Sequence, residues 1–318
     1  MRNFIELLRN KWAEEKFVCP GLDSELGKIP EFGRPIRDEN FNVDTRPYNI
    51  IVAFNHAIVE ATRDLVCAYK PNIAFYEAHG DDGVRALQQT IASIHTMAPD
   101  VPVILDYKRG DIGNTNLGYI SAAFEYFDAD AVTVNPYLGQ EALQPFLDMK
   151  DKGIIVLCRT SNTGSGEFQN LQVNIPAEEL EYLQSVRGSW HLSVGGGGTT
   201  TLYNHVAYRV SQNWNGHYNC ALVAGANYPS ELAEIRAIVG DMPLLIPAVG
   251  FQQKDVPLEQ QVEQVVTAGQ DSHGQGMIIN SSRGIIFASK EADFADAARR
   301  ETLKLHDLIN KFRKGVIV

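Results

Sequence analysis

Acidic and basic side chains alternate closely in the segment VILDYKRGDIGNTN, residues 103–116. One residue separates Asp106 from Lys108, and Asp111 follows three positions later. Because residues two apart on a β-strand point to the same side, we expect the carboxylate of Asp106 to meet the ammonium of Lys108. A buried lysine flanked by carboxylates keeps its proton, since its positive charge is paired. The pattern favours a lysine that donates a proton over one that acts as an amine nucleophile.

A buried ion pair that merely closes the core is the alternative interpretation of Asp106 and Lys108. Lys70, in the apolar segment VCAYKPN, supplies a second positive charge on a neighbouring predicted strand. Asp106 and Asp23, which ends the first predicted strand, already balance the two lysines, so Asp111 adds a carboxylate that neutralisation does not require. Surplus charge beside a pocket costs stability, so it indicates a function.

Eight short apolar runs predict the elements that position these side chains. They span residues 16–23, 66–72, 101–108, 129–137, 153–160, 219–226, 242–250 and 276–283. Residues 49–65 and 82–98 between them have apolar side chains at spacings of three and four, as in amphipathic helices. Buried strands that alternate with such helices favour a parallel sheet. We predict the α/β class, as one (β/α)8 TIM barrel that includes residues 1–318 as a single domain.

Two insertions account for the length beyond eight β/α units. One follows the first predicted strand, over residues 25–49, and the other follows the fifth, over residues 161–218. Residues 202–214 within the second insertion have a helical pattern and are expected to form its crossover helix. The run Gly195–Gly198 is typical of a linker.

In a TIM barrel the active site forms at the carboxyl ends of the strands, so polar residues there are candidates for function. Such residues are Asp23, Lys70, Asn72, Asp106, Lys108, Asn135, Thr160, Ser161, Gln252 and Arg283. The last two follow the seventh and eighth predicted strands, where barrels often bind phosphate. A surface ion pair is the alternative for Arg283.

Composition excludes several classes of partner. With 28 Lys and Arg against 39 Asp and Glu, the net charge is −11 and no basic stripe is present, which argues against nucleic acid. No run approaches the roughly 20 apolar residues of a membrane span. The four cysteines are far apart and the histidines are scattered, so we expect free buried thiols, no metal site and a cytoplasmic location.

Several segments together resemble the orotidine 5′-phosphate decarboxylase family, in particular its longer bacterial and protozoal form. LDYKRGDIGNT resembles the family signature D-x-K-x-x-D-I-x-x-T. The blocks GLD, YKPN, TVNPYLG, RTSN, PAVGFQ and NSSRGI follow the family's order, and the resemblance covers most of the chain. It implies a lyase of pyrimidine (UMP) biosynthesis that converts orotidine 5′-monophosphate to UMP and CO₂ without a metal or other cofactor.

The resemblance implies catalytic roles for four residues. Lys108 matches the lysine that protonates the product carbanion, Asp106 the carboxylate beside the leaving group, and Lys70 the lysine that orders the acids and contacts ribose. Asp111 matches a carboxylate that the family supplies across a homodimer interface to the partner's site, accompanied by Ile112 and Thr115.

The resemblance also implies a set of substrate-binding residues. Asp23 and Asn72 match positions beside the ribose, and Gln252 and Arg283 match phosphate ligands. Thr160 and Ser161 lie where the family reads the pyrimidine, and the sequence leaves open which of them does so. Ala248 departs from the family's usual glycine, which affects the phosphate loop but no catalytic group.

Three other functions remain open from the sequence alone. A metal-dependent phosphosugar decarboxylase shares the D-x-K-x-x-D motif, but Lys70 and RTSN argue against it. A Schiff-base aldolase needs a neutral lysine, which flanking carboxylates oppose. A non-catalytic nucleotide-binding barrel has little need for a complete Asp–Lys–Asp set.

Overall fold

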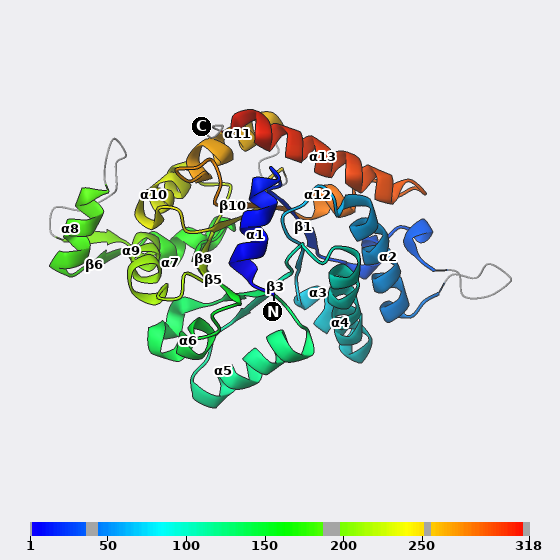
Figure 1. Cartoon of the computed structure of the whole chain (residues 1–318), viewed down its shortest axis with the longest axis horizontal. Helices are drawn as coiled ribbons and strands as arrows, with labels where there is room; N and C mark the ends of the chain where they lie inside the picture. The colour runs from blue at the N-terminus through cyan, green and yellow to red at the C-terminus, as the bar shows by residue number, and fades with distance from the viewer. Residues whose placement is uncertain (1, 36–43, 187–197, 251–255, 314–318) are drawn as a thin grey trace.

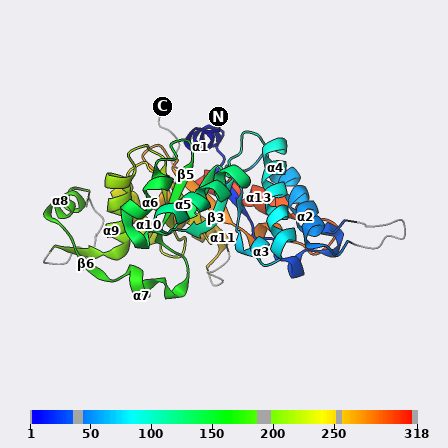
Figure 2. The same ribbon diagram turned by 90° about the horizontal axis from the view of Figure 1, so that it is seen from below.

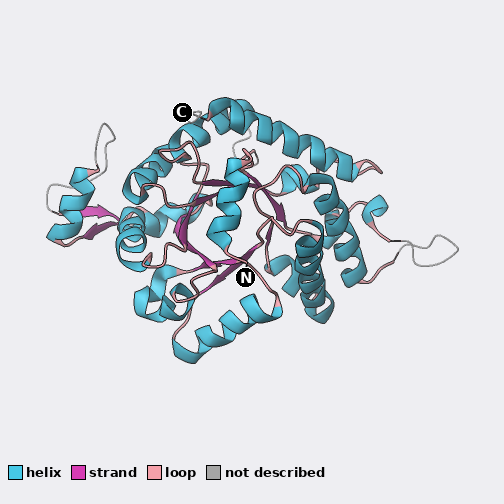
Figure 3. Ribbon diagram, viewed as in Figure 1, coloured by secondary structure: helices cyan, strands magenta, loops and turns pink. Residues whose placement is uncertain are grey.

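The centre of the molecule is a closed sheet of eight strands (Figures 1 and 3). The computed structural model describes residues 2–35, 44–186, 198–250 and 256–313. The barrel strands are β1 (Val18–Leu22), β2 (Lys70–Pro71), β3 (Ile104–Arg109), β4 (Ala131–Val134), β5 (Gly153–Arg159), β8 (Cys220–Ala224), β9 (Leu244–Pro247) and β10 (Met277–Ser281). Each predicted apolar run contains one of them.

All strand pairs in the barrel are parallel, in the order β2, β1, β10, β9, β8, β5, β4, β3. Parallel bridges between Tyr69 and Val103 and between Asn72 and Asp106 join β2 to β3 and close the circle. Every residue of β1, β4, β8 and β10 is buried, because side chains face either the barrel interior or the surrounding helices. The predicted TIM barrel is confirmed.

Helices surround the barrel and cover the outer face of its strands (Figure 3). They are α2 (Pro47–Thr62), α3 (Ala74–Glu77), α4 (Gly80–Met97), α5 (Gly113–Ile120), α6 (Gly139–Leu147), α9 (Leu202–Tyr208), α10 (Pro229–Val239), α11 (Leu258–Gly269), α12 (Arg283–Ile286) and α13 (Phe294–Phe312). The helices predicted at 49–65 and 82–98 correspond to α2 and α4. In α4 the residues Ala86, Leu87, Ile91 and Ile94 form the buried face. Within the described ranges, no helix combines the length and apolar character that a membrane crossing requires.

An additional helix, α1 (Phe4–Ala13), lies across the amino-terminal ends of the strands (Figure 1). The indole N–H of Trp12 donates to the carbonyl of Met277, the first residue of β10, at 2.9 Å. A Cβ on Gly153, the first residue of β5, would lie only 2.2 Å from the Phe4 ring. Helix α1 therefore covers this end of the barrel, and Gly153 permits its close approach.

The two insertions extend from the carboxyl-terminal side of the barrel. After β1 the chain forms 3-10 turns at Leu26–Lys28 and Glu31–Gly33. The insertion after β5 contains a 3-10 turn at Thr163–Ser165 (η5), α7 (Gly166–Gln169), β6 (Gln172–Asn174), α8 (Ala177–Ser185) and β7 (Thr199–Thr201). Strands β6 and β7 pair antiparallel, and together with α8 they project away from the barrel (Figure 2).

The sequence did not predict this two-stranded ribbon, because its strands have only three residues each and are mostly polar. The crossover helix expected at 202–214 is confirmed as α9 followed by a π-helical segment at Arg209–Trp214. Of the glycine run, only Gly198 lies within the described residues.

Candidate active site

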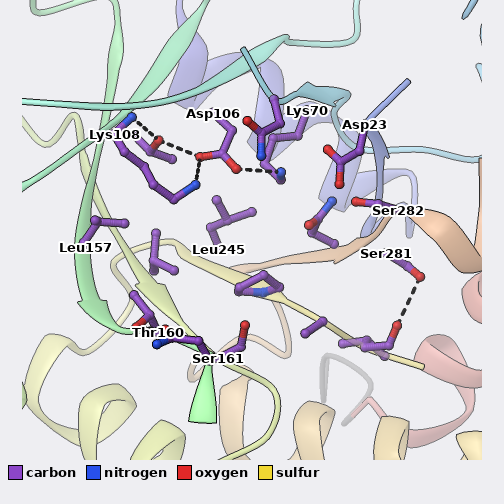
Figure 4. A pocket seen from close by; sticks show the side chains of 18 of the residues that line it. Asp23, Lys70, Asp106, Lys108, Leu157, Thr160, Ser161, Leu245, Ser281 and Ser282 are labelled. Atoms are coloured by element: carbon purple, nitrogen blue, oxygen red, sulfur yellow. Dashed lines mark hydrogen bonds and ion pairs between the residues drawn. The ribbon is translucent and has the colours of Figure 1, made fainter. Parts of the chain in front are cut away.

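A cavity of about 560 Å³ opens at the carboxyl ends of the barrel strands (Figure 4). It is large enough for a nucleotide-sized ligand. The residues singled out in the sequence that line it are Asp23, Lys70, Asn72, Asp106, Lys108, Thr160, Ser161 and Arg283. Residues from β1, β2, β3, β5 and β10 and from the loops after them thus meet at one place, as barrel topology requires.

Asp106 lies between two lysines (Figure 4). The Nζ atom of Lys108 is 2.5 Å from Oδ1 of Asp106, and the Nζ atom of Lys70 is 3.1 Å from Oδ2. Lys70 and Asp106 are buried, whereas the Lys108 side chain is 49% exposed. One carboxylate therefore holds two ammonium groups, of which only Lys108 reaches toward the opening.

Burial and charge act in opposite directions on this cluster. Burial alone would lower the pKa of the Lys70 ammonium, but the carboxylates of Asp106 and Asp23 outweigh it and raise that pKa. Burial would raise the pKa of Asp106, and the two lysines outweigh it so that this pKa falls below its ordinary value. Asp106 and Lys70 are therefore both charged at neutral pH.

Lys108 adopts a left-handed backbone conformation with φ of 51°. The pairing of β3 with β4 shifts register between Leu105 and Arg109, which marks a bulge. A regular two-residue alternation, as expected from the sequence, is therefore wrong in detail, although Lys108 and Asp106 do contact each other. Strain of this kind is frequent at functional sites.

Thr133 of β4 stabilises the bulge. Its hydroxyl accepts hydrogen bonds from the backbone N–H groups of Tyr107 at 2.9 Å and Lys108 at 3.0 Å, and donates to Oδ1 of Asp106 at 2.9 Å. Thr133 is only 1% exposed and lines the cavity. Sequence reasoning missed this residue, because it lies in the middle of an apolar strand rather than at its end.

Asp23 and Asn72 lie on the Lys70 side of the cavity. Oδ1 of Asp23 is buried and has no hydrogen-bond partner within the described part of the chain. An unpaired buried carboxylate oxygen is costly unless a ligand supplies a donor. Asn72 uses its side-chain oxygen to accept from the backbone N–H of Ala74.

Thr160 and Ser161 lie across the cavity from Asp106, with Leu157 and Leu245 between the two sides (Figure 4). The Thr160 hydroxyl donates to Asn162 at 2.8 Å and accepts from Gln169 at 2.9 Å. The Ser161 hydroxyl makes no such bond within the described residues. The cavity thus combines charged groups on one side, apolar walls and a free hydroxyl on the other.

Three other predicted residues fall outside this cavity. Asp111, Ile112 and Thr115 follow β3 but do not line it, and Ile112 is 62% exposed. Oδ1 of Asp111 accepts from the backbone N–H of Ile112 at 2.8 Å. The barrel of one chain alone therefore does not bring Asp111 to Lys108.

Near the loops that are expected to bind phosphate, Arg283 is the first residue of α12 and lines the cavity together with Ala248. Ala248 has φ of 76°, the left-handed region that favours glycine, at the position where the family usually has glycine. The prediction for Gln252 lies outside the described residues.

The part of the chain that the structure describes has no group of three His, Cys, Asp or Glu side chains placed to hold a metal ion.

Comparison with known proteins identifies the family. The model of the orotidine 5′-phosphate decarboxylase / HUMPS family matches residues 52–298. The chain belongs to this family. The resemblance seen in the sequence is confirmed, as is the enzyme class, a decarboxylase and hence a lyase.

Individual relatives support the assignment over nearly the whole chain. Orotidine 5′-phosphate decarboxylase from Cellvibrio japonicus is 43% identical over 313 residues, which cover 98% of this chain and 99% of the relative. The enzyme of the same name from Azoarcus sp. is 42% identical over 315 residues, which cover 98% of this chain and all of the relative.

Two solved structures extend the likeness to the fold. The structure of Leishmania donovani OMP decarboxylase has 31% identity and a TM-score of 0.72, and covers 97% of this chain and 99% of that one. The structure of Leishmania donovani UMP synthase has 32% identity and a TM-score of 0.76, and the match covers 98% of this chain and 57% of that one.

Proposed function

We propose that this decarboxylase converts orotidine 5′-monophosphate to UMP and CO₂ in pyrimidine biosynthesis, with residues 1–318 as a single cytoplasmic domain. The observation that carries the proposal is Asp106 held between Lys70 and Lys108 at a nucleotide-sized cavity. The named relatives, which match this chain end to end, support the substrate. The four cysteines, all free and buried, are consistent with a reducing compartment.

The reaction breaks the bond between the pyrimidine ring and its carboxylate, and the electron pair stays on the ring carbon. The Lys108 ammonium stabilises this developing carbanion electrostatically and then gives it a proton, which forms UMP as CO₂ leaves. Solvent returns a proton to Lys108, whose side chain is half exposed. Asp106 and Lys70 orient Lys108, and the Asp106 charge lies beside the substrate carboxylate.

Binding of the rest of the nucleotide involves the other sides of the cavity. The unpaired oxygen of Asp23 accepts from a ribose hydroxyl, with Asn72 beside the same sugar. Arg283 and Gln252 bind the phosphate. The Ser161 hydroxyl contacts the pyrimidine ring. It makes no hydrogen bond within the described residues, whereas the Thr160 hydroxyl is bonded to Asn162 and Gln169. Contacts remote from the reacting carbon supply binding energy that holds it in place.

We further propose a homodimer in which Asp111, with Ile112 and Thr115, completes the site of the partner. Support comes from the exposed apolar side chains of Ile112, Leu117, Tyr137 and Leu138, all on the segments that follow β3 and β4. Adjacent apolar residues exposed at one rim are typical of a surface that a protein covers.

The proposed reaction is tested by the absorbance change of orotidine 5′-monophosphate in EDTA, for the wild type, Lys108→Ala and the exposed control Lys290→Ala. We expect turnover by the wild type and the control, and a loss of at least about 10³-fold in Lys108→Ala with folding intact. Near-normal turnover by Lys108→Ala would refute the role of the lysine. Turnover that EDTA abolishes would favour the metal-dependent phosphosugar decarboxylase, and UMP binding without turnover would favour a binding-only barrel.

The shared site is tested by mixing two inactive variants, Lys108→Ala and Asp111→Ala. In a mixed dimer one of the two sites receives both wild-type residues, so about a quarter of the wild-type activity is expected after subunit exchange. A mixture that stays inactive while exchange is shown by mass would exclude the shared site.

A further inference from the structure

The part of the insertion after β5 that begins at η5 (Thr163–Ser165) has no role in the proposed reaction, yet one of its side chains lines the cavity. Gln169, the last residue of α7, lines the cavity beside Thr160, Ser161 and Asn162. The rest of the insertion, with β6, α8 and β7, projects away from the barrel (Figure 2). Among the described residues from Thr163 to Thr201, Gln169 is therefore the one that contacts the cavity.

The Gln169 amide makes three hydrogen bonds to the end of β5 and the residue after it. Its oxygen accepts from the backbone N–H of Thr160 at 2.9 Å and from Nη1 of Arg159 at 3.3 Å. Its NH₂ group donates to the Thr160 hydroxyl at 2.9 Å. The backbone N–H and the hydroxyl proton of Thr160 are thus both donated within the loop.

Gln169 is itself anchored by a buried cation. The guanidinium of Arg159 is 2% exposed, lies 3.7 Å from the centre of the Tyr228 ring and donates to the Ser165 hydroxyl. Its Nη2 atom is 3.8 Å from a carboxylate oxygen of Glu231. A planar guanidinium stacked and bonded in this way loses little freedom when it binds another acceptor, so it restricts Gln169.

The other face of the loop is held by the segment after β8. The Asn227 side chain donates to the Ser161 carbonyl at 2.8 Å. A Cβ on Gly225 would lie 2.9 Å from Cα of Ser161, so the two backbones are in close contact. With its backbone held on both sides, Ser161 presents its hydroxyl to the cavity at a defined position.

We propose that Gln169 is a positioning residue that fixes Thr160 and Ser161 so that Ser161 meets the polar edge of a pyrimidine ring. The inference rests on the proposed function for the identity of the ligand. It gives the insertion after β5 a specific task, which is to deliver this amide to the loop. Preorganised polar groups of this kind increase affinity because they do not have to be ordered when the ligand binds.

The test compares two ligands, UMP and ribose 5-phosphate, by calorimetry with the wild type and Gln169→Met. The substitution keeps the length of the side chain and removes all three hydrogen bonds. We expect the affinity for UMP to fall about 10-fold, while that for ribose 5-phosphate, which lacks the pyrimidine, changes by less than about two-fold. The matched control is Glu167→Ala, an exposed residue on the same helix, which should leave both affinities unchanged.

Equal losses for the two ligands, or no loss of UMP affinity, would overturn the proposal. If Gln169→Met does not fold, Thr160→Val removes the hydroxyl that Gln169 holds, and the same selective loss of UMP affinity is expected. A wild type that binds UMP but does not turn over orotidine 5′-monophosphate would refute the proposed reaction and leave the ligand comparison valid. A wild type that binds ribose 5-phosphate but not UMP would refute this inference.

Discussion

The geometry at Lys108 depends on one hydroxyl, so Thr133→Val is the most informative single change. Valine has nearly the shape of threonine but cannot accept the backbone N–H groups of Tyr107 and Lys108 or donate to Asp106. A buried donor left without an acceptor costs about 1–3 kcal/mol. The N–H of Tyr107 is buried and that of Lys108 is partly buried, so we expect the free energy of unfolding to fall by about 2–4 kcal/mol.

The same change should reduce turnover. The left-handed conformation of Lys108 costs about 1–2 kcal/mol and is held by these bonds, so their loss allows the backbone to relax and moves Nζ from its place beside Asp106. A displacement of about 1 Å at a reacting group lowers the rate by about 10²-fold. We therefore expect kcat to fall by about 10–100-fold, with a smaller change in KM.

Urea denaturation and steady-state kinetics measure the two effects. Thr133→Ser is the control, because it keeps the hydroxyl and loses only a methyl group, and it should retain most of the turnover. If Thr133→Val unfolds at the wild-type urea concentration and keeps its kcat, the bulge does not depend on Thr133 and the reasoning fails. A rise in KM with kcat unchanged would assign the hydroxyl to binding instead.

Two further predictions concern stability. Burial would raise the pKa of Asp130, but hydrogen bonds from His95, Arg2 and the backbone N–H of Val103 outweigh it and lower that pKa from 3.8 to about 2. Such a group stabilises the fold above its ordinary pKa, by up to about 2 kcal/mol, and loses this contribution as the pH falls toward 2. Asp130→Asn should therefore have a lower free energy of unfolding than the wild type at pH 6 in urea denaturation. The difference between the two free energies should become smaller as the pH falls, and a difference that does not change with pH would contradict this. Ala248→Gly should raise the free energy of unfolding by about 0.5–1 kcal/mol in thermal denaturation, because glycine adopts the φ of 76° without strain, and a decrease would show that the strain is absent.

The barrel could be predicted from the sequence because buried parallel strands have continuous apolar runs that few other elements share. The ends of these runs then identified eight of the residues that line the cavity, from Asp23 after β1 to Arg283 after β10. The second success depends on a rule of topology, that the carboxyl ends of the strands in a barrel meet at one end.

The details that the sequence could not supply depend on contacts between distant residues. The bulge at Lys108 is held by Thr133, which is 25 positions away and looks like any β-branched residue in a strand. Gln169 lies in a polar insertion, and nothing near it in the sequence indicates that its amide returns to Thr160. The close approach of α1 to Gly153 is likewise visible only in three dimensions.

Helix α1, which covers the amino-terminal end of the barrel, also determines how molecules enter and leave. With Trp12 and Phe4 packed against the first residues of β10 and β5, the cavity opens among the described residues at the carboxyl ends of the strands, and the proposed nucleotide enters and leaves on that side. Product and substrate occupy the same cavity in turn, so a bound product molecule prevents the next substrate molecule from binding. With UMP as the proposed product, we therefore expect UMP to inhibit turnover by competing with the substrate for this cavity.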